Sequence, residues 1–138
     1  LVRELNGIKF CNESIASSPT RTIAGLKAFD KKVFLIAGGY DKHIPFDPLM
    51  PYLVEKVKTL YLCGDTAQKI EDCLKNYESY NGSPEIVRTK DIKGATIMAY
   101  KAAKSGDIIT LSPACASFDA FPNFAARGNY FKEVVNSL

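Results

Sequence analysis

The feature that constrains the fold most is a run of five apolar residues, Val33–Ala37, which ends in the glycine pair Gly38-Gly39. A run that is free of polar residues, too short for a helix and closed by glycines is typical of a parallel strand covered on both faces. Further short segments that contain apolar residues, at 59–63, 85–88 and 108–111, alternate with segments whose apolar residues recur every three or four positions. This alternation predicts a Rossmann-like α/β domain: a mostly parallel sheet, right-handed crossovers and flanking helices.

Asn6-Gly7 separates two short runs that contain apolar residues, at 1–5 and 8–11. Asn-Gly in this setting is a strong signal for a two-residue hairpin turn, so we expect an antiparallel hairpin at one edge of the sheet. Because the sheet would begin at the first residues, we also expect the chain to be the end of a longer protein.

Helix starts are expected where a capping residue stands before proline or opens a helical stripe. The expected caps are Ser18 before Pro19, Asp47 before Pro48, Asp65 with Gln68 in a capping box, Asp91, and Asp119. The second of these helices is expected to use Val57 in its apolar face and to be distorted early by Pro51. The last helix is expected to pack on the sheet through Phe121, Phe124, Gly128, Phe131, Val135 and Leu138.

The length of 138 residues suits one domain, residues 1–138, with a core of ordinary size. The net charge is only +3 and no basic run is interleaved with aromatic residues, which argues against nucleic acid as a partner. No apolar run approaches the roughly 20 residues that span a bilayer, and the chain opens without a signal peptide. We therefore expect no membrane partner and a cytoplasmic location.

The four cysteines include no Cys-x-x-Cys pair, and His43 is the single histidine. A zinc or other metal site is therefore not expected, and a lone loop histidine is given no role. Cys63 and Cys115 lie in or beside apolar strands, so we expect free, buried thiols in a reducing compartment.

Three segments rich in small and polar residues, 12–18, 38–42 and 112–119, each follow a different expected strand. The carboxyl ends of parallel strands meet at one edge of a sheet, where open α/β sheets bind ligands. In the last segment the side chains have little bulk, so backbone N–H groups near a helix start could approach an anion closely. The residues alone leave two interpretations open, an anion site or ordinary strand-to-helix turns.

These segments also resemble the C-terminal part of the Mur ligase family. The similarity is carried by LSPACASFDAFPNFAARGNYF at 111–131, by NESIASS at 12–18 and by GGYDK at 38–42. The family has Asn-Asp-Ser-Lys-Ala-Thr-Asn and Gly-Gly-x-Asp-Lys at the last two places. The resemblance covers essentially all of the chain but only the last third of a complete ligase, and the 111–131 string is typical of the member that adds D-glutamate.

The resemblance implies an ATP-dependent, amide-forming ligase of peptidoglycan synthesis, and hence of cell-wall growth, cell shape and division. ATP would phosphorylate the alanyl carboxylate of UDP-N-acetylmuramoyl-L-alanine, and the D-glutamate amine would attack the acyl phosphate. Such chemistry depends on positioning and charge stabilisation, so no catalytic residue is assigned. ATP, Mg²⁺ and most of the nucleotide sugar would be held by earlier domains, and this D-glutamate-binding domain would be inactive alone.

The resemblance also implies roles for particular residues. D-Glutamate would be bound by Ser17, Lys42, Ser117, Phe118 and Phe124, with Lys42 as the cation that pairs with a carboxylate. Glu13 replaces the commoner aspartate that contacts the nucleotide. Ile15 departs from the family, because it occupies the place of a lysine that faces the nucleotide phosphates in many members.

Two other hypotheses compete with the ligase. A stand-alone Rossmann-like module that binds a nucleotide or small anion and regulates a partner would explain the strand-end loops, but not the three blocks together. A structural docking domain would bind no ligand.

Overall fold

The computed structural model describes residues 1–117 and 120–138 of the chain. The strands are β1 (Arg3–Leu5), β2 (Ile8–Asn12), β3 (Val33–Ala37), β4 (Val57–Leu62), β5 (Glu85–Arg88) and β6 (Ile108–Leu111). The helices are α1 (Pro19–Lys27), the 3₁₀ turn η1 (Asp47–Leu49), α2 (Met50–Lys56), α3 (Ala67–Lys75), α4 (Ile92–Ala102) and α5 (Phe124–Asn136).

The described strands form one sheet in the order β1-β2-β6-β3-β4-β5. Only β1 and β2 pair antiparallel, and the other neighbouring pairs are parallel. Asn6 and Gly7 turn the β1–β2 hairpin with φ of 54° and 79°, which is the left-handed backbone that this dipeptide favours. The expected α/β class, mostly parallel sheet and edge hairpin are confirmed.

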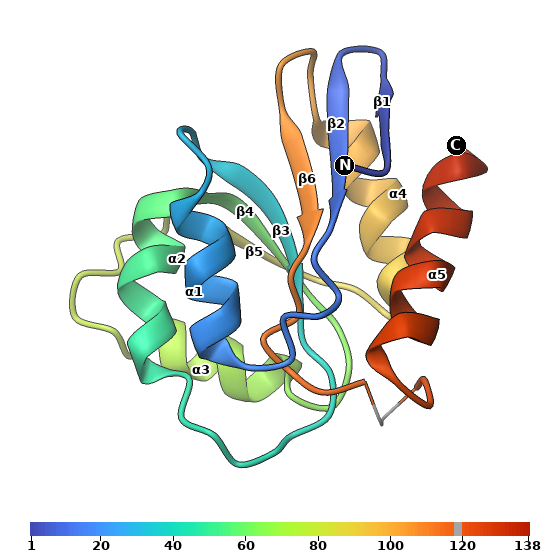
Figure 1. Ribbon diagram of the computed structural model, residues 1–138. Coiled ribbons are helices and arrows are strands. Elements are labelled where there is room, and N and C mark those ends of the chain that lie inside the picture. The colour runs from blue at the N-terminus through green and yellow to red at the C-terminus, as the bar shows by residue number, and fades with distance from the viewer. Residues whose placement is uncertain (118–119) are drawn as a thin grey trace.

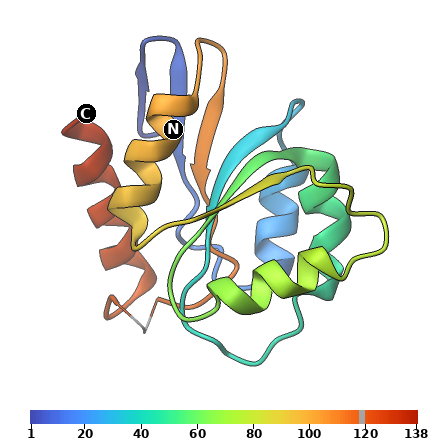
Figure 2. The same ribbon diagram turned by 180° about the vertical axis from the view of Figure 1, so that it is seen from behind.

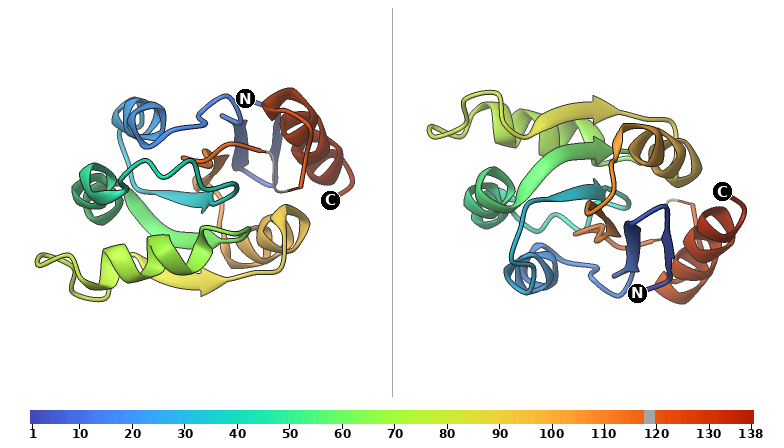
Figure 3. Two further views of the ribbon diagram at one scale, coloured as in Figure 1. Left: turned by 90° about the horizontal axis from the view of Figure 1, so that it is seen from below. Right: turned by 90° about the horizontal axis from the view of Figure 1, so that it is seen from above.

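The helices cover the two faces of the sheet unequally. Figures 1 and 2 show α1, α2 and α3 on one face and α4 and α5 on the other, and Figure 3 shows the sheet edge-on between these two layers. The strand order explains the division, because β3, β4 and β5 follow one another in one direction whereas β6 lies back beyond β3. Right-handed crossovers then place α4 on the opposite face from α1–α3.

Strand β3 is central and buried along its whole length. Its side chains alternate between two apolar cores. Val33, Leu35 and Ala37 face the core under α1–α3, while Phe34 and Ile36 face the core under α4 and α5. A strand covered on both faces must be apolar at every position, which is why its sequence has no polar residue.

Four expectations about η1, α2 and α3 are wrong. Asp47 is not a cap but the first residue of η1, whose N-cap is Phe46 and makes no side-chain capping hydrogen bond. Helix α2 ends at Lys56, and Val57 begins β4 with an extended backbone. Pro51 stands in the first turn, where its missing N–H costs no helical hydrogen bond, so it starts the helix instead of distorting it. Helix α3 starts after Thr66 without the Asp65–Gln68 capping box, and the Thr66 hydroxyl accepts a hydrogen bond from the Gly39 N–H.

The start of α5 also differs from expectation. Its N-cap is Asn123, whose side chain accepts a hydrogen bond from Ala126 N–H; Asp119 lies outside the described residues. Phe131 and Val135 pack on the sheet as expected. Phe124 is 46% exposed and does not join the core, because the helix begins there, beyond the sheet's cover.

Candidate functional site

The loops that follow β2, β3, β4 and β6 are joined by backbone hydrogen bonds at the carboxyl edge of the sheet. The N–H of Ala114 donates to Ala16 O at 2.9 Å and that of Gly38 donates to Pro113 O at 2.9 Å. Tyr40 N–H donates to Ala116 O at 2.9 Å, which forms an isolated antiparallel bridge. The three segments singled out in the sequence therefore form one connected structure.

Gly38 and Gly39 allow these loops to approach closely. Their φ values are 114° and 154°, and an added Cβ would collide with Cys63 O at Gly38 and stand 2.6 Å from Ala116 O at Gly39. The glycine pair is thus required by packing between loops, whether or not a phosphate binds there.

A buried arginine joins the same loops from α5. Arg127 is 2% exposed, and its guanidinium donates to Ser14 Oγ (2.9 Å), Ser14 O (2.7 Å), Cys115 O (2.8 Å) and Ser17 Oγ (3.3 Å). Ser14 Oγ in turn donates to Phe124 O at 2.7 Å. The planar guanidinium fork holds the loops after β2 and β6 in a fixed relation.

Two of the predicted D-glutamate residues meet in one recess. Ser17 and Lys42 line a hollow of about 10 Å³ together with Ala114 and Cys115. Lys42 is exposed, and within the described part of the chain it makes no ion pair. The hollow has room for about one water molecule.

The segment that carries Lys42 is held in place by contacts of the preceding residue, Asp41. Asp41 accepts a hydrogen bond from His43 N–H at 2.7 Å and pairs with Lys69 of α3 at 3.2 Å. The backbone hydrogen bond from His43, followed by the contact with Lys69, keeps the pKa of the Asp41 carboxyl below its usual range. Because Lys69 also lies 5.7 Å from the Phe46 ring, this ammonium connects both ends of the loop to α3.

The other predicted residues do not join this recess. Ser117 is 2% exposed, one residue beyond the bridge between Ala116 and Tyr40, and is absent from the described lining of the hollow. Phe124 is exposed, and its carbonyl accepts the Ser14 hydroxyl. Phe118 lies outside the described residues. Glu13 and Ile15 line a separate groove beside α1.

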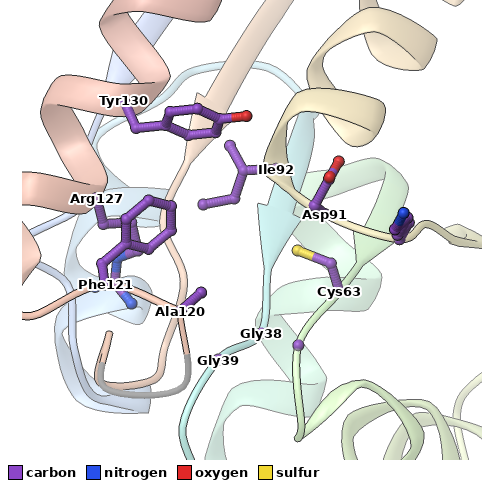
Figure 4. A pocket seen from close by; sticks show the side chains of 11 residues that line it. Gly38, Gly39, Cys63, Asp91, Ile92, Ala120, Phe121, Arg127 and Tyr130 are labelled. Atoms are coloured by element: carbon purple, nitrogen blue, oxygen red, sulfur yellow. The ribbon is translucent and has the colours of Figure 1, made fainter.

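A larger hollow, about 240 Å³, lies on the α4–α5 side of the glycine pair. Figure 4 shows α5 contributing Arg127 and Tyr130, α4 Ile92, and the strand ends Cys63, Gly38 and Gly39. None of the predicted D-glutamate residues is among its described lining residues. The described lining residues of this hollow and of the Lys42 recess have no member in common.

Sequence reasoning missed three buried residues whose hydrogen bonds hold these loops together, Arg127, Ser14 and Thr66. Thr66 is 1% exposed, and its hydroxyl accepts from Gly39 N–H at 3.0 Å and lies 3.2 Å from Cys115 Sγ. A signal for Arg127 existed, because it stands three residues after Phe124 and four before Phe131, on the apolar face of the helix. An arginine on such a face must be satisfied by buried acceptors.

Among residues 1–117 and 120–138, no group of three or more His, Cys, Asp or Glu side chains could hold a metal ion. The described helices include none that is long and apolar enough to cross a membrane. The four cysteines form no disulfide with one another, and Cys63 and Cys115 are buried as expected.

Comparison with known proteins identifies the class of domain. Residues 1–115 match the family model for the Mur ligase glutamate ligase domain. A solved domain of a UDP-N-acetylmuramate:L-alanyl-gamma-D-glutamyl-medo-diaminopimelate ligase from Haemophilus ducreyi shares the fold, with a TM-score of 0.60 at 14% identity over 96% of this chain and 95% of that one. The chain belongs to the Mur ligase family.

Curated relatives show which members of the family the chain resembles. Proteins named UDP-N-acetylmuramoylalanine--D-glutamate ligase from Clostridium botulinum (strain Alaska E43 / Type E3) and Acetivibrio thermocellus are 58% and 56% identical to the chain over its whole length. That from Clostridium acetobutylicum is 54% identical over 99% of the chain. The chain spans about 30% of the length of each of these relatives.

Proposed function

We propose that this chain is the D-glutamate-binding domain of an ATP-dependent ligase that adds D-glutamate to UDP-N-acetylmuramoyl-L-alanine in peptidoglycan synthesis. The observation that carries the proposal is the recess that Ser17 and Lys42, from loops after two different strands, line together with Ala114 and Cys115. The names of the relatives supply the substrates.

The reaction would proceed in two steps. The alanyl carboxylate takes the γ-phosphoryl group of ATP and releases ADP; the D-glutamate amine then attacks the acyl carbon, forming the amide bond as phosphate leaves and a proton is lost. Mg²⁺ would neutralise the ATP phosphates, and its ligands would lie outside this chain, because the described residues offer no fitting cluster.

In this scheme the domain binds and orients D-glutamate. Lys42 would pair with one of its two carboxylates, and the Ser17 and Ser117 hydroxyls and nearby backbone N–H groups would donate to them. Phe124 would contact D-glutamate through its backbone, because its side chain is exposed and its carbonyl oxygen already accepts a hydrogen bond from the Ser14 hydroxyl. The small recess fits a site that is completed when a neighbouring domain closes on it.

Lys42→Ala in the full-length ligase should reduce kcat/KM for D-glutamate by about 30-fold or more, because truncation leaves a carboxylate unpaired at a cost of roughly 2–5 kcal/mol. The KM for ATP should change little. The matched control is Lys32→Ala, which removes an exposed lysine at the opposite end of β3.

The assay is release of phosphate that depends on D-glutamate, with the L-isomer as a comparison. D-Glutamate kinetics of Lys42→Ala within twofold of wild type would refute the site. If the full-length protein released no phosphate in the presence of D-glutamate, UDP-N-acetylmuramoyl-L-alanine and ATP, the ligase function itself would be wrong, and the stand-alone binding module would be favoured.

A further inference from the structure

The segment that carries Lys42 is attached to the rest of the domain at few points. It leaves the sheet at Tyr40, which bridges to the loop after β6, and it returns to the core at Phe46, which is 4% exposed. Residues 41–45 between these points lie outside the described helices and strands. Within the part of the chain that the structure describes, the hydrogen bonds of residues 41–45 all use the Asp41 carboxylate. The position of Lys42 therefore depends on how firmly that carboxylate is held.

The Asp41 carboxylate closes a tight turn around Lys42. Its Oδ1 accepts a hydrogen bond from the His43 N–H at 2.7 Å. This hydrogen bond spans Lys42 and supports the left-handed backbone of His43, whose φ is 59°. Such a φ is uncommon for a residue other than glycine and persists only where the surroundings support it. If the carboxylate moved, the backbone of Lys42 would therefore move with it.

Lys69 of α3 is the residue that holds this carboxylate. Its ammonium donates to Asp41 Oδ2 at 3.2 Å and to Oδ1 at 3.4 Å. The same ammonium lies 5.7 Å from the centre of the Phe46 ring, within the range of a cation–π contact. Asp41 and Phe46 both line the Lys42 recess, whereas Lys69 is absent from its described lining. One cation outside the recess thus contacts two residues of its wall.

We propose that Lys69 is a positioning residue, which holds Asp41 and Phe46 so that the Lys42 ammonium meets a carboxylate of D-glutamate. The inference rests on the proposed ligase function and adds to it a residue that does not contact the substrate. Lys69 is 47% exposed, and an exposed ion pair contributes little to folding. A small displacement of a group that orients a substrate can nevertheless lower the rate strongly. Loss of the ammonium should therefore affect D-glutamate kinetics more than stability.

The test uses the full-length protein and phosphate release that depends on D-glutamate. Lys69→Met keeps most of the apolar stem beside Phe46 but removes the charge. It should lower kcat/KM for D-glutamate about fivefold or more, short of the roughly 100-fold that a misplacement of about 1 Å can cost, and leave the KM for ATP within twofold. Lys69→Arg should keep most of the activity, because a guanidinium also pairs with a carboxylate and stacks on an aromatic ring. Lys75→Met is the matched control, since it removes an exposed α3 ammonium that pairs with Glu71 instead.

A double-variant cycle shows whether Lys69 acts through Lys42. In the Lys42→Ala background, Lys69→Met should change kcat/KM less than twofold, because no ammonium is left to position. Kinetics of Lys69→Met within twofold of wild type, a fall of the same size in both backgrounds, or equal losses toward D-glutamate and ATP would overturn the inference while the ligase function stands. A Lys69→Arg variant as impaired as Lys69→Met would do the same. A wild-type protein that forms no ligation product would instead overturn the proposed function, and the role of Lys69 with it.

Discussion

Replacement of Arg127 should be the most damaging single change at this edge of the sheet. The guanidinium donates at least four hydrogen bonds, two of them to the backbone carbonyls of Ser14 and Cys115. In Arg127→Met the apolar stem is largely kept, but buried acceptors lose their donors at about 1–3 kcal/mol each. Because bonds from one group are not additive, we expect a total loss of about 3–5 kcal/mol.

That loss is a large part of the roughly 5–15 kcal/mol that stabilises a domain of ordinary size. With a urea m-value of about 2 kcal/mol per M, the unfolding midpoint of the chain should fall by about 2 M. Arg88→Ala is the control, since Arg88 is an exposed partner of Glu71 and should cost at most about 1 kcal/mol. A loss below 1 kcal/mol for Arg127→Met would refute the reasoning.

A second measurement separates the effect of Arg127 on the position of the loops from its effect on the free energy of unfolding. If the proposed ligase function holds, then in the full-length protein, at a temperature where the variant is folded, Arg127→Met should lower kcat/KM for D-glutamate more than it changes the KM for ATP. The physical reason is that Ser17, on the loop that Arg127 holds, lines the Lys42 recess. An equal effect on both substrates would indicate a purely structural role.

Two further predictions concern stability and pH. Gly25→Ala should stabilise the domain by about 0.5–1 kcal/mol through helix propensity, whereas Gly128→Ala should destabilise it, because its Cβ would stand 2.8 Å from Asn12; similar urea midpoints for the two variants would contradict this. Burial, followed by the hydrogen bond to Asp47, raises the pKa of Cys73 to about 11. The native state binds the Cys73 thiol proton more tightly than the unfolded state does. The contribution of this proton to the stability of the native state is therefore complete below the unfolded pKa of about 9, and it is lost as the pH rises through 11. Alkylation of Cys73 at pH 8, followed by mass spectrometry, should be slower in native than in urea-unfolded protein, and Asp47→Asn should speed it; equal rates would count against the shift.

Local patterns predicted most of the secondary structure because they depend on neighbouring residues. The Asn6-Gly7 turn, the apolar run of β3 and the Ser18-Pro19 helix start all appear where the sequence placed them. The errors occur where a distant contact competes with a local preference. Val57 fits the apolar stripe of α2, but pairing with Val33 draws it into β4.

The candidate site could likewise be predicted only in part from the sequence. Its position at the carboxyl edge could be predicted, because parallel strands bring their ends together whatever their side chains are. Ser17 and Lys42 line one recess, and their binding of D-glutamate stays a prediction. The burial of Ser117 and the exposure of Phe124 could not be predicted, because each depends on where α5 begins relative to the sheet.

The sequence by itself determined the α/β class, the edge hairpin and the edge of the sheet at which the candidate site lies, since turn chemistry and apolar periodicity act over a few residues. Only the tertiary structure decided that Arg127 would bond to loops 113 residues and 12 residues away in the chain. It also decided that Glu13 and Ile15 would line a groove beside α1 and not the Lys42 recess. Hydrogen bonds and grooves of this kind join segments whose separation leaves no periodic trace, so they exist only once the sheet has set the distances between its loops.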